Sequence, residues 1–61
     1  MYEVYVTGVA SETITEFVEL SEAEAEFRNV MIKAILGKQD ISNIVLSDLE
    51  TSNILASATF E

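Results

Sequence analysis

Glutamate is the residue type whose chemistry and spacing make it the first candidate for a functional site in this chain. Six of them stand within residues 12–26, with no basic residue among them: Glu12, Glu16, Glu19, Glu22, Glu24 and Glu26. Two carboxylates can hydrolyse a glycoside when a deep cleft holds the sugar. Carboxylates also bind hard cations, and a group of them can bind a basic protein surface. The composition and the expected fold discriminate among these three possibilities.

Catalysis is the least expected of the three. The chain has 61 residues, with no His, no Cys and two Gly. It therefore lacks the commonest general base and a thiol nucleophile, and it has no glycine-rich loop to hold a phosphate. A single helix on a thin sheet can hardly form a deep substrate cleft. We expect a protein that is not an enzyme, has no catalytic residues and requires no cofactor.

A metal site is also not expected. Glu22 and Glu26 are four residues apart on a predicted helix and could share one Ca²⁺ ion. However, the sequence has no Asp-rich calcium loop, and the glutamates fall on regular elements instead of a ligand loop. A solvated helix face explains this pair better than a metal does.

The distribution of charge favours binding to a protein. The net charge is −8. Residues 1–27 contain seven acids and no base, whereas residues 28–61 contain four acids and three bases. This sign disfavours direct contact with nucleic acid or an anionic membrane, since Lys and Arg make the phosphate contacts. Helix capping and a solvated strand face explain about half of the acids in residues 12–26, and solubility can explain the rest. They do not explain why no base accompanies them over the first 27 residues.

Period-two alternation predicts a β-hairpin over residues 2–8 and 12–20. In the second strand, Ile14, Val18 and Leu20 form the apolar face. Glu16 falls on that face, which indicates either an edge strand or a bulge.

A helix is predicted over residues 22–36. Ser21 and Glu24 form a capping-box pattern at its start, and Gly37 ends it. The main apolar stripe contains Ala23, Phe27, Val30, Met31 and Ala34, with Ile35 at its border. A second apolar group, Ala25, Ile32 and Leu36, lies on the opposite side. It consists either of ordinary surface hydrophobes or of residues that contact another chain.

The last third of the chain predicts two more strands. Residues 42–49 fit a strand, although residues 41–49 also fit helical spacing with Asp40 as the N-cap. Residues 53–60 alternate, with Ile54, Ala56, Ala58 and Phe60 on one face. The expected fold class is a small α+β single domain, residues 1–61, with β-β-α-β-β order and one helix packed on an antiparallel sheet.

In size, charge and compactness the chain resembles small acidic phage proteins that inhibit restriction enzymes, CRISPR effectors or uracil-DNA glycosylase. Its strand–strand–helix order is similar to that of one short family of uracil-DNA glycosylase inhibitors, although no motif identifies a family. The resemblance implies an inhibitor or regulator whose carboxylates, about 6–7 Å apart along a strand or helix, stand in for DNA phosphates in a basic groove. The expected partner-binding residues are Glu12, Glu16, Glu19, Glu22 and Glu26.

The alternative function is a structural or assembly module. In that case the chain would form a homodimer through Ala25, Ile32 and Leu36 and through its strand edges, because so short a chain buries a small core. No signal peptide or membrane span is recognisable, so we expect a soluble cytoplasmic protein, in the host cytoplasm if a phage encodes it.

Overall fold

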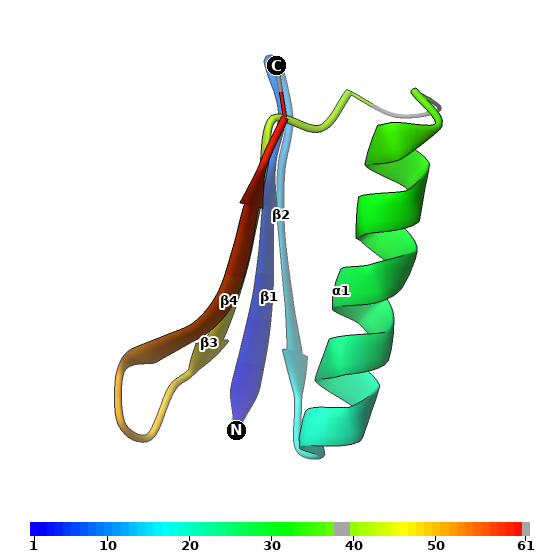
Figure 1. The fold of residues 1–61 in the computed structure, drawn as a ribbon. Helices are drawn as coiled ribbons and strands as arrows, with labels where there is room; N and C mark the ends of the chain where they lie inside the picture. Colours follow the sequence, from blue (N-terminus) through cyan, green and yellow to red (C-terminus); the bar gives the residue numbers. More distant parts are fainter. Residues whose placement is uncertain (38–39, 61) are drawn as a thin grey trace.

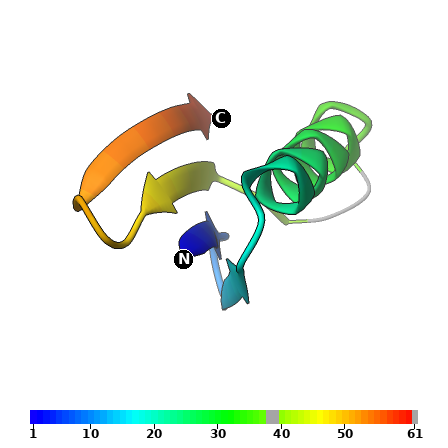
Figure 2. The same cartoon turned by 90° about the horizontal axis from the view of Figure 1, so that it is seen from below.

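The computed structural model describes residues 1–37 and 40–60. Its elements are β1 (Tyr2–Thr7), β2 (Glu12–Phe17), α1 (Leu20–Ile35), β3 (Asn43–Asp48) and β4 (Asn53–Thr59). The strands form one antiparallel sheet in the order β2-β1-β3-β4, and α1 lies against one face of it (Figures 1 and 2). The predicted α+β fold and the choice of a strand within residues 42–49 are confirmed. Lys38, Gln39 and Glu61, which the predicted domain includes, lie outside the described residues.

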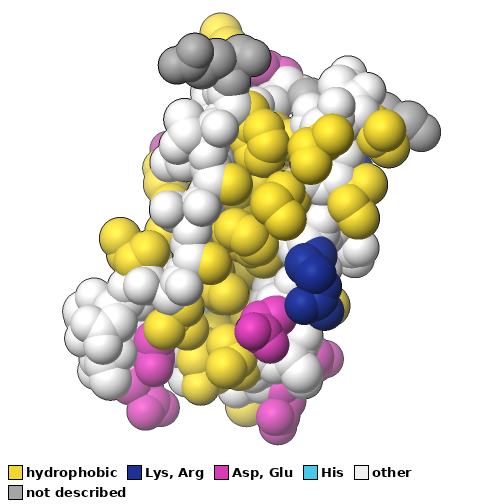
Figure 3. Space-filling view, viewed as in Figure 1, with side chains coloured by type: hydrophobic (Ala, Val, Ile, Leu, Met, Phe, Trp, Pro, Cys, Tyr) yellow, Lys and Arg dark blue, Asp and Glu magenta, His cyan; other side chains and the backbone are white. Residues whose placement is uncertain are grey.

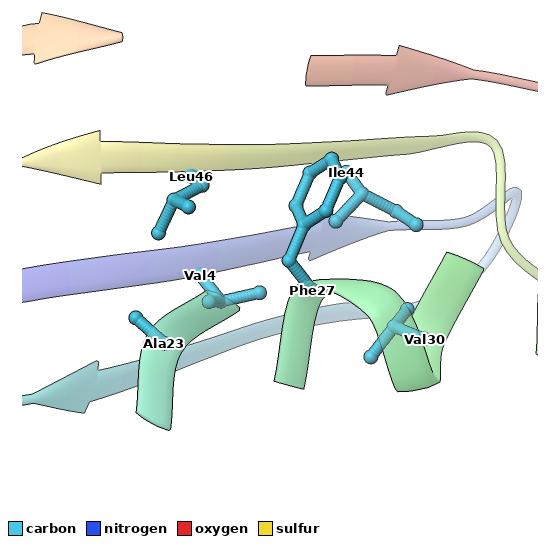
Figure 4. Close-up of a cluster of buried hydrophobic side chains, with 6 residues drawn as sticks. All are labelled: Val4, Ala23, Phe27, Val30, Ile44 and Leu46. Carbon is cyan, nitrogen blue, oxygen red and sulfur yellow. The ribbon is translucent and has the colours of Figure 1, made fainter. Parts of the chain in front are cut away.

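The core lies between α1 and the sheet. It consists of Val4, Ala23, Phe27, Val30, Ile44 and Leu46, which are all buried (Figure 4). Helical spacing brings Ala23, Phe27 and Val30 onto one side of α1, and the register places Val4 opposite Leu46 on the two central strands. The main predicted helix stripe is therefore confirmed, except that Ile35 is 69% exposed.

The prediction of which face of β2 is apolar was wrong. Val4 pairs with Thr15 and Tyr2 pairs with Phe17, so Thr15 and Phe17 share the face of Val4, toward α1. Ile14 lies on the opposite face and is 54% exposed. The aromatic ring of Phe17, which packs against the core, determines the orientation of this strand. β2 is an edge strand, which explains how Glu16 is tolerated beside Ile14.

The helix begins earlier than predicted, and Ser21 does not cap it. Glu19 is the N-cap residue: its backbone is extended, with φ −99° and ψ 133°, and its carbonyl accepts the N–H of Ala23 at 3.2 Å. Ser21 lies within the first turn, so the predicted capping box does not form. Gly37 follows the C-cap with φ 71° and donates its N–H to the Ala34 carbonyl, as expected for a helix stop.

A β-bulge changes the predicted face of β4. Leu46 pairs with Ala56, but its neighbour Ser47 pairs with Ile54, so Leu55 is the extra residue. Ala56, Ala58 and Phe60 pack against the core, as predicted. Ile54 does not share their face, because its partner Ser47 lies on the opposite side of the sheet from Leu46.

Candidate protein-binding surface

Two of the predicted binding residues lie on β2. The register pairs Glu12 with Thr7 and Glu16 with Glu3, which places all three glutamates on the face of the sheet that α1 does not cover. We call this the open face. Glu12 and Glu16 are about 13 Å apart along the strand, so the predicted spacing of 6–7 Å does not apply to them. The near neighbour of Glu16 is Glu3, directly across the strand pair, where like charges repel.

Tyr5 lies between these carboxylates on the open face. Its hydroxyl donates a hydrogen bond to Glu12 Oε2 at 2.8 Å. This bond, followed by partial desolvation and the charges of Glu12 and Glu3, raises the pKa of Tyr5 above its ordinary value. Tyr5 thus holds the Glu12 carboxylate at the β2 edge and stays protonated.

The helix glutamates divide between the two flanks of α1. Seen from its N-terminal end, as in Figure 2, a right-handed helix turns clockwise as it recedes. Glu22 and Glu26 precede the buried Ala23 and Phe27, so they lie on the flank toward β2. Glu24 follows Ala23, so it lies on the flank toward β4. The Glu22–Glu26 pair therefore has the predicted spacing, with a rise of about 6 Å between the two residues.

All five predicted glutamates consequently lie on the β2 side of the molecule. Glu12 and Glu16 belong to the edge strand, Glu19 links that strand to the helix, and Glu22 and Glu26 line the adjacent helix flank. We call these five residues the acidic side. Glu26 is half-buried, and the other four are exposed.

Few bases accompany the acidic side. The four strands contain no Lys or Arg. Lys33 precedes Ala34 and so shares the β2 flank of α1, but it is about 10 Å further along the axis than Glu26. Among the described residues, the only ion pair joins the Met1 amino group to Glu50 at 3.6 Å. The carboxylates of the acidic side thus have no ion-pair partner within the part of the chain that is described.

Two residues of this surface were not predicted as binding residues: Glu3 and Tyr5. The signal for them was present, because alternation in β1 puts Glu3, Tyr5 and Thr7 on one face. What the sequence could not show was the pairing of that face with the glutamate face of β2, which depends on the hairpin register.

The residues predicted for self-association remain on the outer side of α1. Ile32 is 53% exposed and Leu36 is 61% exposed, whereas Ala25 is half-buried. Ile35, the border residue of the main stripe, adds a further exposed side chain near the C-terminal end of α1.

No pocket was found in the structure over its described residues. Residues 1–37 and 40–60 also contain no group of three or more acidic residues placed to hold a metal ion. Among the described helices, none is long and apolar enough to cross a membrane.

Comparison with known proteins gives no relative: no family model, curated protein or solved structure matches the chain.

Proposed function

We propose that this protein is a small non-catalytic binding protein that presents its acidic side to the basic groove of a nucleic-acid-binding enzyme. A CRISPR effector, a restriction enzyme or a DNA glycosylase has a groove of this kind, which binds phosphates through Lys and Arg. By occupying the groove, the protein acts as an inhibitor or regulator that competes with DNA.

The observation that carries this proposal is the gathering of all five predicted glutamates on the β2 side. Random placement for solubility would distribute the acids around the domain and mix them with bases. Here Glu16 lies opposite Glu3, at a cost in repulsion, and no described strand supplies a base. A basic partner removes that repulsion on binding, and its field accelerates association.

The test is a capture experiment with two matched variants. The protein is immobilised, exposed to host lysate at low salt, and washed at low salt or at about 0.5 M salt, where screening is strong. We expect it to capture a nucleic-acid-binding enzyme that salt or added DNA releases. The purified enzyme should then lose activity in the presence of the protein and recover it as the DNA concentration rises.

The matched variants locate the binding surface. Glu16→Lys with Glu22→Lys changes the acidic side, and Glu24→Lys with Glu50→Lys changes acids away from it. Each pair carries one helix residue and alters the net charge by the same amount, and all four residues are exposed. Only the first pair should abolish inhibition. An equal loss for both pairs, or capture of nothing except further copies of the chain, contradicts the proposal.

A second candidate function, assembly with copies of itself, is supported by the exposed Ile32 and Leu36. If this helix surface forms the contact, Ile32→Glu should convert an oligomer into monomers in sedimentation experiments. An unchanged mass excludes α1 as the contact.

A further inference from the structure

The β4 edge of the sheet differs from the β2 edge in its charge and in how far α1 packs over it. Residues 51–60 contain no charged side chain, whereas β2 carries Glu12 and Glu16. α1 packs against β3, β1 and β2 but hardly contacts β4, and a band of hydrophobic side chains remains visible between β4 and α1 (Figure 3). Exposed, uncharged edge strands are rare because they pair with other strands.

The hydrogen bonds show which backbone groups of β4 are free to pair. The Phe60 N–H donates to the Ser42 carbonyl at 2.7 Å, so the backbone of Phe60 points toward the β3 side, as in a hydrogen-bonded pair of the ladder. Such pairs alternate along an antiparallel ladder. The backbone groups of Ala56 and Ala58 therefore also point toward β3, and those of Ser57 and Thr59 point outward from the sheet.

We infer that the β4 edge is the contact surface for a second copy of this chain, with the two β4 strands antiparallel about a twofold axis at Ala58. In this arrangement Ser57 of each copy pairs with Thr59 of the other through their outward N–H and C=O groups. Ala58 faces Ala58 of the second copy. The inference deepens the second candidate function, self-assembly, and rests on it: it places the contact on the β4 edge and not on α1, and it does not depend on the acidic side.

The choice of a second copy follows from the backbone pattern and from charge. The outward groups of Ser57 and Thr59 require an extended strand as partner, and this segment is complementary to itself under a twofold rotation. The bulge at Leu55 lies outside the paired residues, so it does not interrupt the ladder. Because each copy carries a net charge of −8, two copies attract each other only where neither presents carboxylates.

The resulting dimer has one continuous sheet in the order β2-β1-β3-β4-β4-β3-β1-β2. Both helices lie on the same face, because the twofold axis is perpendicular to the sheet. Phe60 of one copy pairs with Ala56 of the other on that face, above the β4 strands that α1 leaves uncovered. The two acidic sides lie at opposite ends of the sheet, where their mutual repulsion is smallest.

Analytical ultracentrifugation of the wild type and of two proline variants tests the contact. The wild type should sediment at twice the 6.7 kDa chain mass. Ser57→Pro should sediment as a folded monomer, because its outward N–H makes no bond within the sheet. Ile14→Pro is the matched control, since the Ile14 N–H points outward at the β2 edge, and it should remain dimeric. A monomeric wild type at about 1 mM, which corresponds to a very weak complex, overturns the inference, as does a folded, dimeric Ser57→Pro.

Disulfide trapping tests the register even if the proline variant does not fold. The wild-type chain contains no Cys. Facing residues of a non-hydrogen-bonded pair have Cα atoms about 4.5 Å apart, which a disulfide can span. Ala58→Cys should therefore form a covalent dimer in glutathione disulfide, whereas Ile32→Cys on the outer side of α1 should not. Equal cross-linking of both, or none at position 58, refutes the register.

Discussion

Gly8→Ala is expected to destabilise the fold by a steric contact between two distant segments. Gly8 follows the last residue of β1, and its N–H donates to the Ser11 carbonyl at 2.8 Å. A Cβ atom at this position would overlap the backbone carbonyl oxygen of Asp40, well inside the 3.0 Å limit for real Cβ contacts. Gly8 does not have a positive φ. Glycine is therefore required here because there is no room for a Cβ atom, and not because of the backbone conformation.

The expected cost combines two effects. Moving backbone apart to admit a methyl group costs about 1–3 kcal/mol. The same movement disturbs the Asp40 carboxylate, whose Oδ2 accepts the N–H groups of Val9 at 2.9 Å and Ala10 at 3.3 Å. These bonds are exposed, so we assign their weakening about 1 kcal/mol. The free energy of unfolding should fall by about 2–4 kcal/mol, which is a large fraction of the stability of so small a domain.

Urea denaturation followed by far-ultraviolet circular dichroism measures this change at one fixed protein concentration. Gly37→Ala is the matched control, because Gly37 has φ 71° and no atom within 4 Å of an added Cβ. In that variant the free energy of unfolding should fall only by the cost of placing alanine in the left-handed conformation, about 1–2 kcal/mol. Asp40→Asn should reproduce the weakened loop bonds without the clash. A Gly8→Ala variant no less stable than wild type, or no less stable than Gly37→Ala, would refute the steric argument.

Two further predictions concern single side chains. Glu19→Asp should raise the free energy of unfolding by about 1 kcal/mol in urea denaturation, because Glu19 is an N-cap without a side-chain cap bond; Ser21→Ala, inside the first turn, should change it by less than about 0.5 kcal/mol. Glu12→Ala should lower the pKa of Tyr5 in a spectrophotometric titration of the phenolate, since the hydrogen bond to Glu12 is what mainly raises it. The titration uses a Tyr2→Phe background, and an unchanged pKa would show that Glu12 does not hold the Tyr5 hydroxyl.

Much of the fold could be predicted because local periodicity belongs to the chain itself. The alternation in residues 2–8 predicted the first strand, and the helical spacing of Ala23, Phe27 and Val30 identified the buried face of α1 correctly. Gly37 identified the helix end, since the left-handed residue after a helix is usually glycine. These signals depend on neighbours within a few residues, and no distant contact overrides them here.

The predictions from local sequence pattern were wrong where contacts between distant segments compete with that pattern. Ile14 is as apolar as a core residue, but the hairpin register and the packing of Phe17 turn it outward. The sequence offered Ser21 as a helix cap, yet the helix begins at Leu20. Nothing near Ile54 in the sequence predicts the bulge at Leu55, which arises in the pairing of β4 with β3.

For the candidate site, too, some features follow from the sequence and others only from the tertiary structure. The sequence by itself determined the number of glutamates, the absence of bases beside them and the lack of a His or Cys for catalysis. Only the tertiary structure decided that Glu12 and Glu16 lie at an edge strand and that Glu22 and Glu26 occupy the helix flank above it. Strand order and the direction in which α1 crosses the sheet set that arrangement, and both result from packing between segments far apart in the chain. The same packing left β4 uncovered at the other edge, where its outward backbone groups can pair with another strand.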